Sequence, residues 1–228
     1  MIRQYEHFNK NKADVSVLYA DASLHLAQCS YQRPSEDEFF MPCAAITYVL
    51  QGQKVVFLNG IKHEMKEGDA LFIPGNSILY SDISVRQKPF VSLNALIRDD
   101  ALLGDHTLRW ALTMKAQPPV QEIQQLSPAS DPDILGWMAC RITDNLQLHH
   151  YARSANMSLS AFKRWFRNNM GGSPAQWVIE KRLERARYLL LHKQRSVTVA
   201  SFESGFHDVS YFIRKYRQHY GHTPGCEK

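Results

Sequence analysis

Long apolar runs are missing from this sequence. No segment approaches the roughly 18 consecutive apolar residues of a membrane-spanning helix. The opening residues, MIRQYEHFNKNK, are too polar for the apolar core of a secretory signal peptide. These absences argue against a membrane protein and predict a cytoplasmic protein that has no membrane partner.

Cysteine is also scarce. The four cysteines lie far apart and form no CxxC pair: Cys29, Cys43, Cys140 and Cys226. This spacing argues against a zinc ribbon or a redox motif and predicts free thiols. The composition, with 44% hydrophobic and 21% charged residues, is typical of one large globular domain or two small ones.

Acidic residues are rare in the C-terminal part of the chain. Residues 141–228 contain 15 of the 27 Lys and Arg residues but only 6 of the 22 Asp and Glu residues, a balance of +9. Residues 1–140 have a balance of −4. This asymmetry indicates a basic module that meets a polyanion. A solvated charged surface is the alternative, and charge alone does not choose between the two.

An internal repeat makes the nucleic-acid interpretation stronger. SLSAFKRWFRNNMGGSP (158–174) and DVSYFIRKYRQHYGHTP (208–224) align without a gap at an offset of 50, with 6 of 17 positions identical. Helical spacing predicts apolar stripes of Phe162, Trp165 and Phe166 in the first copy and of Phe212, Tyr216 and Tyr220 in the second. Gly171 and Gly221 are placed to end these helices.

A shorter predicted helix precedes each copy. The first, 146–155, ends at Asn156, and the second, 196–204, ends at Gly205. Asn and Gly tolerate the left-handed backbone that a sharp turn requires. The small residues Ala152 and Ser201 lie four positions before the two turns, where crossing helices approach closely. Each pair is therefore predicted to be a helix-turn-helix unit whose second helix enters the major groove.

A long helix is predicted between the two units, from about 174 to 191. Ser173 is a natural N-cap and Pro174 a natural first helical residue. Ile179, Leu183, Ala186 and Leu190 are expected to form its buried stripe. Its length of about 27 Å suits a rod that holds two recognition helices about one DNA turn apart.

Residues 146–224 resemble the DNA-binding domain of the AraC/XylS family of transcription regulators. The resemblance is strongest in RLERARYLL (182–190) and GFHDVSYFIRKYRQHYGHTP (205–224), where GF, SYF, an aromatic residue, G and TP follow in a highly specific order. It implies that ILGWMACRIT (134–143) is the first helix of the domain.

The resemblance also implies which residues contact DNA. Base contacts fall on Ser160, Lys163 and Arg164 in the first unit and on Val209, Ser210, Ile213 and Arg214 in the second. Arg167 and Arg217 lie one helical turn further on and are better placed for phosphates. The chemistry agrees, because Arg pairs with guanine, Ser bonds flexibly, and Val or Ile contacts a thymine methyl. The alternative is that these cations only solvate helix surfaces.

Two departures from the family pattern concern the second unit. Ala200 and Ser201 occupy positions where the family usually has a branched aliphatic residue followed by Ala, so this unit is expected to be looser. Relatives usually continue beyond the position of Pro224, after which this sequence has four more residues. Closing contacts from a C-terminal tail are therefore expected to be absent.

Residues 40–97 are predicted to be β structure. Apolar or alternating runs are separated by turn signals, of which Asn59-Gly60 is the strongest hairpin signal. The segment from Tyr48 to Ser77 resembles the small cupin-like β-barrel of the same family. This resemblance implies a sensor module that holds a small ligand, contacts a partner protein or mediates dimerisation.

No catalytic or metal site is predicted in the barrel. Metal-dependent cupins have two neighbouring His, a Glu and a later His, whereas His63 stands alone beside Glu64 and His25 is distant. His63 is expected to be a surface residue, and no cofactor is expected. Lys54, Lys62 and Arg86 could pair with an anionic effector, but are expected to be plain edge-strand charges.

The expected fold class is α+β. A small cupin-like β-barrel domain (1–115) and a linker (116–133) precede an all-α domain (134–228) that has two helix-turn-helix units joined by a linker helix. The expected function is sequence-specific transcription regulation, with activation as the expected direction, by a monomer or weak homodimer. Its partners would be double-stranded promoter DNA, RNA polymerase, and a small-molecule effector or regulatory protein. An antagonist that binds another regulator and a cupin enzyme with an accessory DNA-binding domain are the alternatives.

Overall fold

The computed structural model describes residues 3–4, 14–20, 23–98 and 134–227 of the 228-residue chain. The chain divides into two compact units, Met1–Asp131 and Pro132–Lys228, which are taken in turn. The predicted linker, 116–133, lies outside the described residues.

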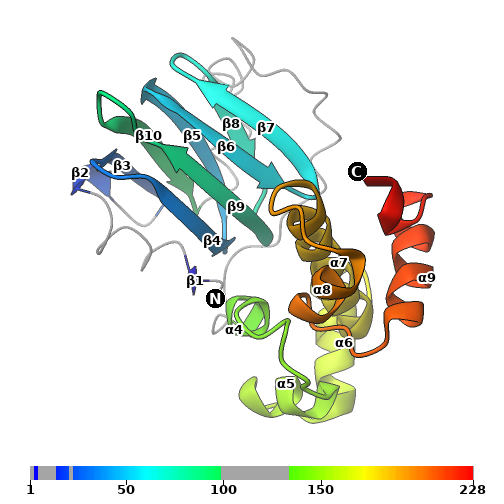
Figure 1. Ribbon diagram of the computed structural model, residues 1–228. Coiled ribbons are helices and arrows are strands. Elements are labelled where there is room, and N and C mark those ends of the chain that lie inside the picture. The colour runs from blue at the N-terminus through cyan, green and yellow to red at the C-terminus, as the bar shows by residue number, and fades with distance from the viewer. Residues whose placement is uncertain (1–2, 5–13, 21–22, 99–133, 228) are drawn as a thin grey trace. The chain divides into compact units, whose positions relative to one another are not determined.

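The N-terminal unit consists of two β-sheets (Figure 1). The first has the order β1-β4-β9-β6-β7 and the second the order β2-β3-β10-β5-β8. Every strand pairing is antiparallel except that of β1 with β4. The strands are β1 (Arg3–Gln4), β2 (Asp14–Ala20), β3 (Leu24–Tyr31), β4 (Ser35–Met41), β5 (Ala44–Gln51), β6 (Gln53–Leu58), β7 (Ile61–Lys66), β8 (Ala70–Ile73), β9 (Ser77–Ser84) and β10 (Phe90–Ile97).

The predicted hairpin is confirmed. Leu58 of β6 pairs with Ile61 of β7, and the two residues between them, Asn59 and Gly60, have φ of 51° and 75°. Positive φ at both central positions is the requirement of a type I′ turn, which Asn-Gly meets at low cost. The prediction that β structure begins at about residue 40 is wrong, because β3 and β4 precede it and pair with β10 and β9.

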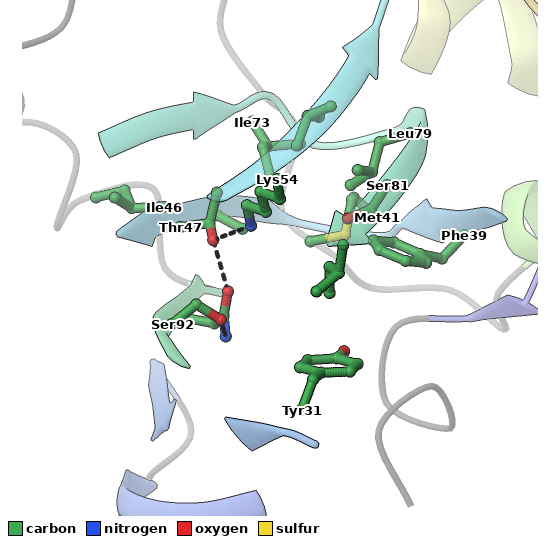
Figure 2. A pocket seen from close by; sticks show the side chains of 14 residues that line it. Tyr31, Phe39, Met41, Ile46, Thr47, Lys54, Ile73, Leu79, Ser81 and Ser92 are labelled. Atoms are coloured by element: carbon green, nitrogen blue, oxygen red, sulfur yellow. Dashed lines mark hydrogen bonds between the residues drawn. The ribbon is translucent and has the colours of Figure 1, made fainter. Parts of the chain in front are cut away.

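The core of this unit lies between the inward faces of the two sheets. Alternate residues of each strand point inward, as Val56 and Leu58 do on β6. Lys54 has the same parity, points inward as well (Figure 2) and is buried, with 8% of its surface exposed. The prediction of a plain edge-strand charge is therefore wrong for Lys54, since β6 lies between β9 and β7. Lys62, on the edge strand β7, is exposed and pairs with Glu64.

The C-terminal unit is helical. Its elements are α4 (Ile134–Ala139), α5 (Leu148–Ser154), α6 (Leu159–Met170), α7 (Pro174–Leu191), α8 (Val197–Glu203), α9 (Val209–Tyr220) and the short 3-10 helix η2 (Pro224–Glu227). The α+β fold class is as predicted, and α7 begins and ends where its N-cap and apolar pattern predict. Ile179 is only half-buried, while Trp177, Val178 and Leu189 are buried, so the buried stripe of α7 is broader than predicted.

The first helix is shorter than predicted. The sequence predicts a helix over 134–143, whereas α4 ends at Ala139 and a series of turns follows. The guanidinium of Arg182 on α7 donates hydrogen bonds to the carbonyls of Ile142 and Asp144. These hydrogen bonds hold the turns that follow α4. Among the described residues, no helix is both long and apolar enough to cross a membrane.

The short helix η2 contacts two other helices of the domain. Glu227 of η2 accepts a hydrogen bond from the Tyr216 hydroxyl at 2.7 Å, and its carboxylate lies 2.9 Å from Nε of Arg187. These contacts join η2 to both α9 and α7.

Candidate nucleic-acid interface

The two recognition helices, α6 and α9, begin and end in the same way. Oγ of Ser158 accepts a hydrogen bond from the Ala161 amide at 3.2 Å, and Oδ1 of Asp208 accepts one from the Tyr211 amide at 2.6 Å. These side chains satisfy backbone donors that the first turn of a helix leaves unpaired. At the other end Gly171 and Gly221 have φ of 67° and 81°, the left-handed conformation predicted for them.

The turns before these helices also correspond. The Met157 amide donates to the Ala152 carbonyl at 2.9 Å, and the Phe206 amide donates to the Ser201 carbonyl at 3.1 Å. In each turn the residue just before that donor has positive φ: 54° at Asn156 and 89° at Gly205. The two predicted helix-turn-helix units are therefore present, each with the turn residue that the sequence indicates.

The predicted DNA-contacting residues of the first unit share an exposed face of α6. Ser160, Lys163, Arg164 and Arg167 are all exposed. Phe162 and Phe166, on the opposite face, are completely buried. Within the described part of the chain, Lys163, Arg164 and Arg167 form no ion pair, so their charges remain available to a ligand. No acidic residue lies on α6 itself.

The second unit presents a more apolar surface. Ser210, Arg214 and Arg217 are exposed on α9, whereas Val209 and Ile213 are half-buried. The guanidinium carbon of Arg214 lies 5.9 Å from the centroid of the Tyr211 ring, a distance at which a cation interacts with an aromatic face. The structure thus brings the predicted residues of each helix to one surface, but leaves fewer free cations at the start of α9.

The supporting helix of the second unit contains buried hydroxyls. Ala200 and Ser201 of α8 are completely buried, as is Ser204 just after it. Neither Ser201 Oγ nor Ser204 Oγ has a hydrogen-bond partner among the described residues. A buried polar atom without a partner costs about 1–3 kcal/mol. In the supporting helix of the first unit the buried hydroxyl without a partner is that of Tyr151, whereas Ala152 stands at the position of Ser201.

A close approach of backbone joins the second unit to the start of the domain. A Cβ added to Gly205 would lie 2.8 Å from Cα of Thr143 and 3.0 Å from Nε of Arg182. Glycine is thus required at this turn for its positive φ and for the absence of a side chain. Sequence reasoning predicted the first requirement but missed the second, because Thr143 is far away along the chain.

Comparisons with known proteins agree with this arrangement. The model of a family described as a helix-turn-helix domain matches residues 151–226. The chain is 30% identical over 162 residues to YdeC of Bacillus subtilis (strain 168), an uncharacterized HTH-type transcriptional regulator, covering 68% of this chain and 55% of YdeC. It is 26% identical over 222 residues to the HTH-type transcriptional activator RhaS of Klebsiella pneumoniae (strain 342), covering 96% of this chain and 70% of RhaS. The chain thus spans about half the length of YdeC.

Two solved structures resemble the two parts of the chain. One is a transcriptional regulator with an AraC-type DNA-binding domain from Chromobacterium violaceum, 29% identical, covering 41% of this chain and 84% of that one, with a TM-score of 0.39. The other is a cupin superfamily protein from Desulfitobacterium hafniense, 18% identical, covering 39% of this chain and 80% of that one, with a TM-score of 0.35.

Proposed function

Since this chain belongs to the AraC/XylS family of helix-turn-helix regulators, we propose that it binds promoter DNA sequence-specifically and activates transcription. The observation that carries the proposal is the repeated unit. Two recognition helices have the same caps and turns, and each presents arginines on its exposed face. One chain then places two helices in successive major grooves without dimerising.

The roles of the exposed residues follow from their positions. Ser160, Lys163 and Arg164 lie in the first half of α6 and contact base edges, with Arg164 suited to a bidentate pair with guanine. Arg167 lies one turn later and contacts phosphates. In α9 the corresponding phosphate contact is made by Arg217. The corresponding base contacts are made by Val209, Ser210, Ile213 and Arg214.

Regulation is assigned to the N-terminal unit, through a small ligand or a partner protein. RNA polymerase is the expected partner at the promoter. We expect the protein to act in the cytoplasm, where its target DNA lies, as a monomer or weak homodimer.

Binding of the full-length chain to DNA tests the proposal. Genome-wide mapping of bound sites supplies a promoter fragment, and gel shifts measure affinity for it and for a scrambled fragment at several salt concentrations. Because each phosphate contact releases a counterion, log affinity should fall steeply with log salt. The scrambled fragment should bind more weakly at every salt concentration. Equal affinity for both fragments would contradict sequence-specific recognition.

A second function, antagonism of another regulator, is favoured by one observation. The unpartnered hydroxyls of Ser201 and Ser204 weaken the support of the second recognition helix. In that case the chain would bind a second regulator and not DNA. Absence of any salt-dependent shift with promoter DNA, together with binding to a regulator protein, would favour this function over the first.

A further inference from the structure

The two recognition helices differ in the chemistry of their N-cap side chains. Oγ of Ser158 accepts the Ala161 amide at the start of α6, and Oδ1 of Asp208 accepts the Tyr211 amide at the start of α9. Both N-cap residues are exposed. Asp208 directly precedes Val209, the first of the proposed base-contacting residues of its unit. Its carboxylate is therefore at the end of the helix that is proposed to enter the major groove.

Only one carboxylate oxygen of Asp208 is used by the cap. Oδ1 accepts the Tyr211 amide at 2.6 Å, whereas Oδ2 has no hydrogen-bond partner among the described residues, and the carboxylate forms no ion pair with them. The first basic residue along α9 is Arg214, whose guanidinium lies against the Tyr211 ring. Oδ2 is thus an exposed acceptor that a ligand can use.

The first unit has no acidic group at this position. A serine hydroxyl donates as well as accepts, so Ser158 still has a proton to donate while its oxygen caps α6. Neither α5 nor α6 contains an acidic residue. The start of α6 can therefore bond to DNA acceptors or donors, whereas the side chain at the start of α9 can only accept.

Duplex DNA offers a carboxylate few donors. Phosphate oxygens, guanine O6 and N7, and thymine O4 are all acceptors, so they repel it. The donors in the major groove are the 4-amino group of cytosine and the 6-amino group of adenine. Adenine has its N7 acceptor beside the amino group, so cytosine is the better match for a single carboxylate oxygen. A carboxylate in the major groove therefore selects cytosine and disfavours guanine and thymine.

We propose that Asp208 is a specificity-determining residue of the second unit, whose Oδ2 accepts a hydrogen bond from the 4-amino group of a cytosine in the DNA site. The inference rests on the proposed function, because it takes α9 to lie in the major groove. It supplies an acceptor to a unit whose other proposed base contacts are one hydroxyl, one arginine and two apolar side chains: Ser210, Arg214, Val209 and Ile213.

Gel shifts of the full-length chain with a panel of promoter fragments test the proposal. Each base pair of the half-site in which Arg214→Ala relaxes preference is replaced by the other three, at fixed salt. One position should prefer cytosine over guanine and thymine by about tenfold. Asp208→Asn keeps the shape and the cap, and with Oδ1 on the Tyr211 amide its outward atom is Nδ2, a donor. The preference at that position should change to guanine or thymine, and the other positions should keep theirs.

Two further variants separate base recognition from charge and from capping. Glu203→Gln removes an exposed carboxylate from α8 of the same unit and should leave the cytosine preference unchanged. Asp208→Ser copies the cap of the first unit and should flatten the preference while the chain stays folded.

The inference is overturned if the unaltered chain prefers cytosine nowhere in that half-site. It is also overturned if Asp208→Asn changes affinity for all fragments equally, because repulsion of phosphates or a capping role acts alike on every sequence. If the unaltered chain prefers promoter over scrambled DNA while Asp208→Asn leaves every base preference unchanged, this inference fails alone. Equal affinity of the unaltered chain for promoter and scrambled DNA would contradict the proposed function, and the inference with it.

Discussion

The two helix-turn-helix units have the same backbone and different interiors. Their caps, turn hydrogen bonds and positive-φ residues correspond one to one. The first unit fills its interior with Tyr151, which packs edge-on against Trp137 with ring centroids 5.8 Å apart. At the corresponding position the second unit has Ala200, followed by the buried Ser201.

The second unit is closed by other means. The backbone at Gly205 approaches Thr143 directly, and Glu227 joins Tyr216 to Arg187. Both units contain packed aromatic rings, such as Phe162 with Phe166 and Phe212 with Tyr216. The second unit adds the close backbone approach at Gly205 and the polar contacts of Glu227. The comparison teaches that a sequence repeat preserves the backbone frame while its stabilising contacts diverge.

Gly205→Ala should break the second unit most severely. Its Cβ would meet the Thr143 backbone at 2.8 Å, in a residue whose φ is 89°. Backbone strain of about 1–3 kcal/mol adds to overpacking of about 1–3 kcal/mol, so the free energy of unfolding should fall by about 4 kcal/mol in urea denaturation. Gly171→Ala is the matched control, since its φ is 67° but its Cβ would meet open space. It should cost about 1 kcal/mol, and equal losses would refute the role of the close approach.

Glu227→Ala should remove the polar contacts that join η2 to Tyr216 and Arg187. It leaves the Tyr216 hydroxyl without its acceptor and the Arg187 guanidinium without its ion-pair partner, and the acidic side chain is only 7% exposed. We expect a loss of about 2 kcal/mol in thermal unfolding, because the partners become unpaired. Glu227→Gln retains an acceptor for Tyr216 and should lose less. If Ala and Gln behave alike, the ion pair with Arg187, and not the bond to Tyr216, provides the stabilisation.

Arg164→Ala and Arg214→Ala compare the two units on DNA. Arg164 lies beside Lys163 and Ser160 on an exposed face, whereas Arg214 lies beside the half-buried Ile213. We expect Arg164→Ala to cost about 1–3 kcal/mol of binding and to relax preference at one or two base pairs. Arg214→Ala should cost less.

Titration against one promoter at fixed salt measures both variants. Arg167→Ala is the control for base specificity, because loss of a phosphate contact should weaken all sequences about equally. An equal or larger loss for Arg214→Ala would show that the first unit does not dominate recognition.

Ser201→Ala should make the units more alike. It removes a buried hydroxyl that has no partner and installs the residue found at Ala152 in the first unit. We expect a gain of about 1 kcal/mol in stability, measured by urea denaturation. Thr198→Ser, on the exposed side of the same helix, should change stability by less than about 0.5 kcal/mol. A loss on Ser201→Ala would mean that this hydroxyl is hydrogen-bonded in solution.

Local signals in the sequence were sufficient to predict where most helices of the C-terminal unit begin and end. Ser158, Ser173, Gly171 and Gly221 act through neighbours in sequence, so caps and ends were predictable. Contacts between segments that lie far apart in the sequence were not predictable from such signals. The turns after α4 are held by Arg182, which belongs to another helix.

The burial of Lys54 was not predicted, because residue type alone does not show whether a charged side chain lies inside the fold. Strand alternation places it on the same face as Val56 and Leu58, and this signal was present in the sequence. Its charge suggested an edge strand instead, because the order of strands in the sheet cannot be read from spacing. Only the pairing of β6 with both β7 and β9 makes the position interior.

The contact between Gly205 and Thr143 has a consequence for how the domain unfolds. Residues 142–144 precede the first unit, are held by Arg182 of the connecting helix, and meet the turn of the second unit. We expect unfolding of either unit to release this shared segment. We therefore expect the helical domain to behave as one cooperative element, in which amides of α5 and α8 exchange with solvent through the same global opening and not through separate local ones.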